Sequence, residues 1–273
     1  MTAPSVNSRT AAGNEALAAF REAPGDAVVA LDFDGTLAPI VEDPAQARAH
    51  PGAAPALARL APLVDAVVIV TGRPAATAVE YGGFADVPGL EVLGQYGLER
   101  WADGKLTVPD PPPGVAEARA KLPALLQAAG APEGVHIEDK HHALAVHTRR
   151  CAEPQVALDR LRSLVEALAE RTGLHVEPGR YVLELRPPGV DKGVALRDFL
   201  AGRTPSAVLY AGDDLGDLAA YAALDALRAE GTPTVKICSG SDEVPALAER
   251  ADVVVDGPAG VVALLEELAD SLS

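Results

Sequence analysis

Acidic side chains follow two apolar segments of the chain, at the points where buried strands are expected to end. The run 27–31 leads directly into Asp32 and Asp34, and the run 207–211 leads into a second acidic group. That group consists of Asp213, Asp214 and Asp217. Open parallel sheets bind their ligands beyond the carboxyl ends of the strands, so we expect both groups to line one site.

The chemistry that such a site supports follows from its charge. Buried acids repel each other, and their burial is costly unless a cation or a proton is present. Oxygen ligands without clustered histidine or cysteine favour Mg²⁺ over zinc. A bound metal ion would hold a phosphate oxygen and screen the acids, which would allow one carboxylate to attack phosphorus. Aspartate can act as such a covalent nucleophile, and a second acid is then placed to protonate the leaving group and later to activate water.

Two further segments carry groups that could bind phosphate. Thr71, Gly72 and Arg73 follow the apolar run 66–70 and offer a hydroxyl and backbone donors at a predicted helix start. Lys192 opens another predicted helix and could bring a cation to the phosphoryl oxygens. Each feature taken alone has an ordinary structural explanation, such as a helix cap or a surface charge. The set as a whole, with every member at a strand end or a helix start, favours a phosphate-binding site.

The segments that position these residues alternate between short β-branched runs and amphipathic stretches rich in Ala and Leu. This alternation is typical of a parallel sheet covered by helices on both faces. The predicted strands are 27–31, 66–70, 90–94, 207–211, 234–237 and 251–255. The predicted helices are 51–60, 74–81, 192–201, 214–227 and 258–272. Asp103 and Gly104, between the short runs 98–101 and 106–108, indicate a β-hairpin. Together these elements predict a doubly wound α/β core.

Two proline-rich breaks, at 109–114 and 187–189, interrupt this core. Between them the order changes to helix, strand, strand, twice over, with short connections that suit an antiparallel sheet. The helices are expected over 115–130 and 155–172, and the strands over 135–138, 143–147, 174–178 and 181–186. The resulting assignment is a disordered N-terminal stretch over 1–14, a core over 15–109 and 188–273, and an inserted domain over 110–187.

The composition excludes several classes of protein. The 273 residues carry a formal net charge of −16, which argues against a nucleic-acid-binding protein with a basic face. No apolar run approaches the roughly 20 residues of a membrane span, and the N-terminus lacks the apolar segment of a signal peptide. Cys151 and Cys238 are too few for a disulfide framework. We therefore expect a cytoplasmic protein without membrane or nucleic-acid partners.

Four segments resemble the sequence motifs of the haloacid dehalogenase superfamily of phosphatases. They are DFDGTL at 32–37, VTGR at 70–73, DKG at 191–193 and AGDDLGD at 211–217. The resemblance implies a Rossmann-like core with Asp32 as nucleophile and Asp34 as general acid and base. It also implies that Thr71 and Lys192 bind phosphate. The acids that it implies at the Mg²⁺ site are Asp32, Asp34 through its carbonyl, and Asp213, with Asp214 and Asp217 as neighbouring acids.

The inserted αββαββ domain resembles the cap of the trehalose-6-phosphate phosphatases within this superfamily. Three segments carry this narrower resemblance: 94–99 after the third strand, 138–147 on the first hairpin of the insert, and 179–187 on its last strand. Departures from the family pattern weaken the assignment of sugar contacts more than that of phosphatase chemistry. They are Arg180 for the usual Lys, Gln95-Tyr96 for a Ser/Asn-His pair, Gly216 for Thr and Leu218 for an acid.

Polar residues in and near these segments are expected to bind a small polar substrate, since sugar hydroxyls need directional partners. The expected contacts are Gly72, Arg73, Gln95, Tyr96, Gly97, Lys140, His141, Arg149, Arg180, Glu184 and Arg186. A period of two places Arg180, Val182, Glu184 and Arg186 on one face of a strand. That face could bind substrate or could simply face solvent. The two proline breaks are expected hinge ends for closure of the cap.

The resemblance, taken with the motif residues, predicts a Mg²⁺-dependent phosphatase. It would release trehalose and phosphate from trehalose 6-phosphate through an aspartyl-phosphate, the last step of trehalose biosynthesis. Sugar phosphates of the sucrose or mannosyl type are alternative substrates. A non-catalytic sugar-phosphate sensor would have lost the nucleophile or the metal acids, yet Asp32 and Asp213 are both present. A phosphoacceptor signalling domain would leave the insert without a role. The trehalose-6-phosphate synthase of the same pathway is a candidate partner.

Overall fold

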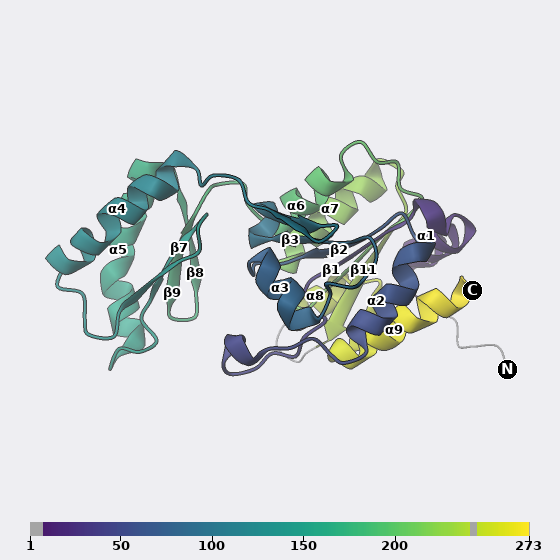
Figure 1. Cartoon of the computed structure of the whole chain (residues 1–273), viewed down its shortest axis with the longest axis horizontal. Coiled ribbons are helices and arrows are strands. Elements are labelled where there is room, and N and C mark those ends of the chain that lie inside the picture. Colours follow the sequence, from purple (N-terminus) through teal and green to yellow (C-terminus); the bar gives the residue numbers. More distant parts are fainter. Residues whose placement is uncertain (1–7, 241–244, 273) are drawn as a thin grey trace. The chain divides into compact units, whose positions relative to one another are not determined.

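The computed structural model of the chain describes residues 8–240 and 245–272. These residues form two compact units (Figure 1). The first contains the described residues up to Val108 and those from Asp191 onward, and the second is Pro109–Val190. The second unit therefore begins one residue before, and ends three residues after, the insert that we set at 110–187.

The first unit is built on an eight-stranded sheet in the order β12-β11-β10-β1-β2-β3-β4-β5. Its strands are β1 (Val28–Leu31), β2 (Ala66–Val70), β3 (Leu90–Gly94), β4 (Glu99–Ala102), β5 (Lys105–Thr107), β10 (Val208–Gly212), β11 (Thr234–Gly240) and β12 (Val253–Asp256). Neighbouring strands are parallel except in the pairs β3–β4 and β4–β5, which are antiparallel. Strands β4 and β5 form the expected hairpin. Asp103 and Gly104 at its turn have φ of 50° and 72°, as a two-residue turn with left-handed backbone requires.

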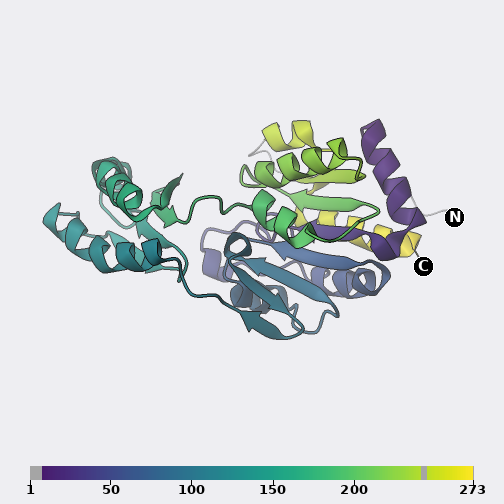
Figure 2. The ribbon, with the colours of Figure 1, turned by 90° about the horizontal axis from the view of Figure 1, so that it is seen from above.

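Helices cover both faces of this sheet, which confirms the predicted doubly wound α/β class. One face packs on α1 (Ala11–Glu22), α2 (Ala53–Leu60), α3 (Ala75–Gly82) and α9 (Gly257–Ser271). The opposite face packs on α6 (Lys192–Leu200), α7 (Asp217–Ala229) and α8 (Pro245–Arg250). Figure 2 shows α6 and α7, in green, together on one side of the strands. Alternate strand residues enter the two cores, so the strands read as continuous apolar runs.

The strand register brings the ends of four parallel strands to one edge of the sheet. Leu31 of β1 lies opposite both Ala211 of β10 and Ile69 of β2, and Val70 lies opposite Leu93 of β3. The chain runs outward from β1 in one direction through β2 and β3, and in the other direction from β10 through β12. The edge beyond β1 and β10 is therefore the point where the strand order reverses, which is where open α/β sheets bind ligands.

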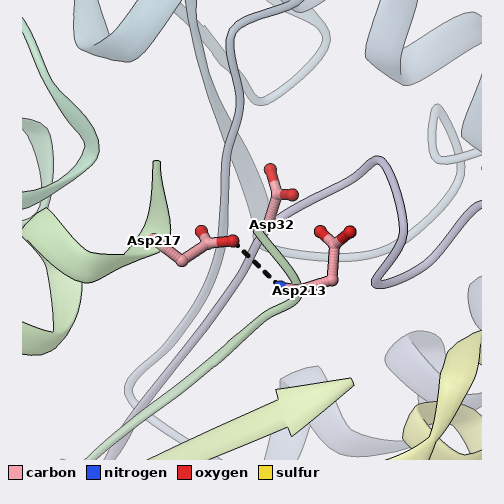
Figure 3. A group of neighbouring side chains, drawn as sticks. All are labelled: Asp32, Asp213 and Asp217. Atoms are coloured by element: carbon pink, nitrogen blue, oxygen red, sulfur yellow. Dashed lines mark hydrogen bonds between the residues drawn. The ribbon is translucent and has the colours of Figure 1, made fainter. Parts of the chain in front are cut away.

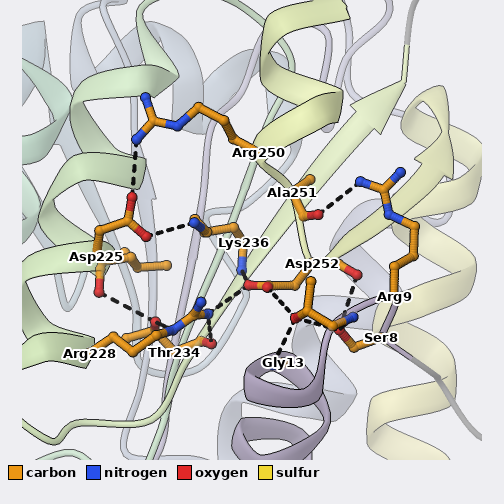
Figure 4. Close-up of polar contacts among 12 residues, drawn as sticks. Ser8, Arg9, Gly13, Asp225, Arg228, Thr234, Lys236, Arg250, Ala251 and Asp252 are labelled. Atoms are coloured by element: carbon orange, nitrogen blue, oxygen red, sulfur yellow. Dashed lines mark hydrogen bonds and ion pairs between the residues drawn. The ribbon is translucent and has the colours of Figure 1, made fainter.

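The N-terminal arm differs from the expectation of disorder over residues 1–14. Residues 1–7 lie outside the described residues, but the expectation is wrong for residues 8–14. Thr10 caps α1 by accepting a hydrogen bond from the amide of Gly13 at 3.0 Å. The Arg9 amide and the Ser8 hydroxyl both donate to the carbonyl of Asp252 (Figure 4). A threonine cap followed by an Ala-rich stretch is a helix start that composition alone does not distinguish from a polar tail.

The buried carboxylate of Asp252 is the centre of this arm's attachment. Its oxygens accept hydrogen bonds from the Thr10 hydroxyl at 2.6 Å, from Arg228 at 2.7 Å and from the amide of Lys236 at 2.9 Å (Figure 4). Burial alone would raise the pKa of Asp252, but these donors lower it. The carboxylate therefore joins α1, α7 and β11, which are far apart in the sequence.

We expect Asp252→Ala to lower the free energy of unfolding by about 3 kcal/mol, because it leaves three donors without their acceptor. The variant should also be cut by trypsin after Arg9. Asp225→Ala is the matched control, since Asp225 pairs with Lys236 and Arg250 at a more exposed place and should cost about 1 kcal/mol or less. Urea unfolding at pH 7 measures both. Equal losses for the two variants would contradict the central role of Asp252.

The second unit is a four-stranded antiparallel sheet in the order β6-β7-β9-β8, covered by two helices. Its elements are α4 (Pro113–Ala128), β6 (His136–Asp139), β7 (Leu144–His147), α5 (Pro154–Thr172), β8 (His175–Gly179) and β9 (Val182–Arg186). Leu183 and Leu185 of β9 are buried with Leu144 and Val146 against both helices. The alternate residues of β9 therefore lie on the opposite face of the sheet, which none of the described helices of this unit covers.

Other differences from the expected elements are local. The helix predicted over 214–227 begins at Asp217, because the preceding loop wraps around the carboxylate of that residue. Helices α1 and α8 were not predicted. In the described part of the chain, no helix is both long enough and apolar enough to cross a membrane.

Candidate active site

The two predicted acidic groups meet around one buried lysine. The Lys192 ammonium nitrogen lies 3.0 Å from Asp32 Oδ1, 2.8 Å from Asp217 Oδ1 and 3.7 Å from Asp214 Oδ1. Lys192 begins α6, whose N-terminus is capped by the carboxylate of Asp191. Burial alone would lower the pKa of Lys192, but the surrounding carboxylates raise it well above its usual value. The lysine is therefore held as a cation among the acids.

Asp217 is occupied by protein groups on every side. Its Oδ1 accepts from Lys192 and from the hydroxyl of Tyr210 at 2.6 Å, and its Oδ2 accepts from the amides of Asp213 at 2.9 Å and Asp214 at 3.0 Å. These four bonds match the roughly four acceptor positions of a carboxylate. Figure 3 shows how Asp217 supports the loop that carries Asp213. Asp217 thus orients Lys192 and the Asp213 loop. Its hydroxyl donor Tyr210 was not singled out in the sequence, because a tyrosine inside an apolar strand reads as core.

Asp213 presents the opposite situation. Its Oδ1 is buried and, within the described residues, has no hydrogen-bond partner. Asp32, Asp213 and Asp217 each offer an oxygen within 4.8 Å of the others. Burial and neighbouring acids raise the pKa of Asp213 to about 7, and burial likewise raises the pKa of Asp32 well above its usual value. An orphaned carboxylate oxygen among repelling acids is typical of a site for a hard divalent cation, so Asp32 and Asp213 fit Mg²⁺.

In EDTA, we expect the folded protein to lose roughly 2–4 kcal/mol of stability as the pH rises from 5 to 8. The folded chain keeps the proton of Asp213 up to its pKa of about 7, whereas the unfolded chain releases it near 3.8, so a rise in pH through this window favours unfolding. Because Mg²⁺ binds deprotonated acids, it should stabilise the protein more at pH 8 than at pH 5.5. Thermal unfolding measures this, with Asp213→Asn as control. An equal effect of Mg²⁺ at both pH values would contradict the metal assignment.

One glycine of the first acidic motif is needed for close packing. Gly35 has φ of 70°, and a side chain at this position would collide with the carboxylate of Asp213. The Gly35 carbonyl also accepts a hydrogen bond from Ser239 of β11 at 2.7 Å. The turn after Asp34 can therefore pass directly over the acids of the neighbouring strand.

Asp34 lies at the start of this turn, and its carboxylate is paired with Arg73. The guanidinium donates from Nε to Oδ2 and from a terminal nitrogen to Oδ1, both at 2.7 Å. Thr71, at the end of β2, is buried, and its hydroxyl accepts from the amide of Arg73 at 3.1 Å. The segment Thr71-Gly72-Arg73 therefore lies beside the first acidic motif, but the side chain of Arg73 is directed to Asp34.

The loop after β3 has unusual backbone geometry. Gln95, Tyr96 and Gly97 have φ of 47°, 58° and 93°, a strained conformation for the two residues other than glycine. The amides of Gln95 and Tyr96 donate to the carbonyls of Arg73 and Thr71, which fastens this loop to the Thr71 segment.

The buried side chain of Glu99 binds this loop, a role that the sequence did not predict. One of its oxygens accepts from the side-chain amide of Gln95 at 2.8 Å, and the other accepts from the amide of Ala75 at the start of α3 at 2.7 Å. The side chain of Gln95 is accordingly buried in this contact. A Glu at the beginning of a short hairpin strand carries no signal of such a role.

The predicted sugar contacts of the second unit lie in and around its sheet. Lys140 forms an ion pair with Glu184, and Arg186 binds Glu177 on the adjacent strand at 2.8 Å. His141 has φ of 68° in the turn between β6 and β7. Arg149 is exposed in the connection to α5.

Arg180 requires a correction within this group. We expected it on one face of a strand with Val182, Glu184 and Arg186. It lies instead in the turn between β8 and β9, because β9 begins only at Val182. Glu184 and Arg186 do share a face of β9, where alternate residues are partly exposed.

Comparisons with solved structures place this fold in a class. The structure superposes on a haloacid dehalogenase-like hydrolase from Bacteroides thetaiotaomicron with a TM-score of 0.64, at 16% identity, over 88% of this chain and 98% of that one. It also superposes on Aspergillus fumigatus trehalose-6-phosphate phosphatase with a TM-score of 0.67, at 25% identity, over 98% of this chain and 99% of that one. The fold is that of the haloacid dehalogenase-like hydrolases.

The sequence comparison is narrower. Residues 30–255 match the Trehalose-phosphatase family. The trehalose-phosphate phosphatase of Mycobacterium avium (strain 104) is 35% identical over 258 residues, which is 89% of this chain. The chain spans 62% of the length of that relative. The chain belongs to the trehalose-phosphatase family.

Proposed function

We propose that this chain hydrolyses trehalose 6-phosphate to trehalose and phosphate, with Mg²⁺ and through an aspartyl-phosphate on Asp32. The observation that carries the proposal is the buried carboxylate of Asp32, held at 3.0 Å by Lys192. It lies beside an oxygen of Asp213 for which residues 8–240 and 245–272 offer no hydrogen-bond partner. Family membership supports the choice of substrate, and the acid cluster supports the chemistry.

In the first step, an oxygen of Asp32 forms a bond to phosphorus while the bond from phosphorus to the sugar oxygen breaks. Asp34 donates a proton to the departing sugar oxygen. In the second step, Asp34 accepts a proton from water, the water oxygen bonds to phosphorus, and the bond to Asp32 breaks. Lys192 offsets the negative charge that gathers on the phosphoryl oxygens, and Thr71 offers them a hydroxyl donor.

Asp32, the carbonyl of Asp34 and Asp213 would hold the Mg²⁺ ion, with Asp214 nearby. When bound, the ion screens the acids from the anionic substrate and polarises the phosphoryl group. Asp217 has a different task, because its oxygens already accept four hydrogen bonds. It holds Lys192 toward Asp32 and fixes the loop of Asp213.

We propose that polar side chains of the second unit bind the sugar hydroxyls. Lys140 forms an ion pair with Glu184, and Arg186 forms one with Glu177, so a sugar hydroxyl must fit into an existing polar network. Such a network favours one arrangement of hydroxyls, because a wrong sugar leaves charged groups unpaired. His141, Arg149 and Arg180 belong to the same proposal, as do Gly72, Tyr96 and Gly97 of the first unit.

Phosphate release from a panel of sugar phosphates tests the proposal. The panel contains trehalose 6-phosphate, sucrose 6-phosphate and glucose 6-phosphate, each with Mg²⁺ and with EDTA. We expect kcat/KM for trehalose 6-phosphate to exceed the others by at least about 100-fold, and EDTA to abolish turnover. Comparable rates on several sugars would instead support a broader sugar phosphatase. Tight binding without turnover would support a non-catalytic sensor.

The location and the partner follow from the substrate. A phosphorylated sugar is a polar anion that does not cross an apolar bilayer unaided, so we propose that the chain acts in the cytoplasm, in the same compartment as its substrate. The trehalose-6-phosphate synthase that supplies this substrate is the proposed partner.

A further inference from the structure

The side chain of Arg73 is bound to the carboxylate of Asp34 rather than left free to bind a phosphate. Two parallel hydrogen bonds of 2.7 Å join the guanidinium to both oxygens of Asp34. This paired geometry fixes the plane of a carboxyl group as well as its position. The side chain of Arg73 is 15% exposed, whereas that of Asp34 is 34% exposed. The better-buried partner is therefore the one that can act as the support.

Arg73 is itself held from three sides. Its third guanidinium nitrogen donates to the carbonyl of Pro44 at 3.0 Å. The guanidinium carbon lies 5.6 Å from the ring centre of Phe33 and 5.4 Å from that of Tyr81, which are distances of cation–π contacts. An arginine whose three guanidinium nitrogens all donate to protein groups is poorly available to a ligand.

The carboxyl group of Asp34 needs such a support. It stands in the turn 32–38, where its side chain is partly exposed. Proton transfer requires a donor within about 3 Å of the departing oxygen and in the correct orientation. A freely rotating carboxyl would spend most of its time elsewhere, and small displacements of catalytic groups reduce rates by about 100-fold.

We propose that Arg73 is a positioning residue that orients the carboxyl group of Asp34 toward the leaving-group oxygen. This role rests on the proposed function and replaces the substrate contact that we expected for Arg73. When one Asp34 oxygen carries the proton, the contact to the other oxygen still holds the group in place.

The leaving group distinguishes this role from substrate binding. A sugar leaves as a strongly basic alkoxide and needs a proton in the transition state, whereas p-nitrophenolate is a weak base and leaves without one. A residue that acts through Asp34 should therefore matter for a sugar phosphate and not for the phosphorylation step with p-nitrophenyl phosphate. The later attack of water needs Asp34 with both substrates.

The experiment compares Arg73→Gln and Arg73→Lys with the control Arg48→Gln. Arg48 also contacts the ring of Tyr81, with its guanidinium carbon 3.9 Å from the ring centre. It donates to the backbone carbonyls of Ala45 and Ala47, in the loop that contains Pro44. For Arg73→Gln we expect kcat on trehalose 6-phosphate to fall about 100-fold, with KM changed less than about 3-fold. Arg73→Lys should be intermediate, because one ammonium cannot hold both oxygens. Arg48→Gln should match the wild type.

With p-nitrophenyl phosphate, Arg73→Gln should release a rapid burst of p-nitrophenol at the wild-type rate, followed by slow turnover. The same substitution in an Asp34→Asn background should change neither phase, since a residue that acts through Asp34 has nothing left to orient. A raised KM with unchanged kcat would overturn the proposal in favour of substrate binding. A slowed burst, or an added loss in the Asp34→Asn background, would overturn it as well.

Activity of the wild type on the sugar-phosphate panel distinguishes failure of the proposed function from failure of the Arg73 proposal. If the wild type hydrolyses another sugar phosphate of the panel and not trehalose 6-phosphate, the substrate assignment is wrong. The Arg73 comparison then uses that sugar phosphate and decides the role of Arg73 independently. If the wild type releases phosphate from no ester, both proposals are wrong.

Discussion

The Asp32→Asn variant is expected to lose turnover of trehalose 6-phosphate by at least about 10⁵-fold while it keeps its fold. The neutral amide cannot form the bond to phosphorus, so no covalent intermediate arises and Asp34 has no leaving group to protonate. Stability should change by about 1 kcal/mol or less, because Asp32 is an acid whose burial disfavours its charge. Lys192 keeps its contact with Asp217 at 2.8 Å.

Two measurements test this expectation, together with circular dichroism and urea unfolding as checks of the fold. Phosphate release gives the loss of turnover. Acid quenching tests the intermediate directly: Asp34→Asn should accumulate phosphorylated protein from p-nitrophenyl phosphate, because its second step lacks a base, and Asp32→Asn should accumulate none. Phosphorylated protein in the Asp32→Asn variant, or turnover within about 100-fold of the wild type, would refute Asp32 as the nucleophile.

The Lys192→Met variant is expected to lose both activity and stability. Methionine matches the length of the lysine stem but removes the cation that three carboxylates face. Breaking a buried ion pair from one side costs about 3–5 kcal/mol. The loss in EDTA should be largest at pH 8 and smaller at pH 5.5, because the abandoned acids can take up protons as the pH falls. Turnover should fall by at least about 10³-fold, as expected when a charge that stabilises the transition state is removed.

Lys236→Met is the matched control for this substitution. Lys236 of β11 is also mostly buried, and it pairs with Asp225 of α7 at 2.6 Å. This pair lies outside the acidic cluster of the site. It should lose some stability with little dependence on pH and keep its kcat. If Lys192→Met retained full stability at pH 8, the acids would not depend on this lysine for compensation, and the electrostatic account of the site would be wrong.

The core elements were predictable because their signals are local. Apolar runs of five residues shortly before Asp32, Thr71 and Asp213 indicated buried parallel strands, and the structure has β1, β2 and β10 there. The hairpin at Asp103-Gly104 was predicted from the left-handed backbone that its turn needs. The N-terminal helix α1 was missed, because its stability depends on contacts of Thr10 with Asp252, which is 242 residues away in the chain.

The features of the site also fall into those that the sequence predicts and those that depend on the tertiary structure. The amino-acid sequence by itself determined which acids, which threonine and which lysine reach the carboxyl edge of the sheet, since a strand's end and its following turn depend on neighbouring residues. Only the tertiary structure decided which partners these side chains take. Arg73 turns to Asp34, and Asp217 gives both its oxygens to Lys192, Tyr210 and two amides. Asp213 keeps one oxygen that has no partner in the described part of the chain. The physical reason is that a hydrogen bond between side chains depends on ångström-scale distances across strands that are distant in sequence, and hydrophobic periodicity does not encode those distances.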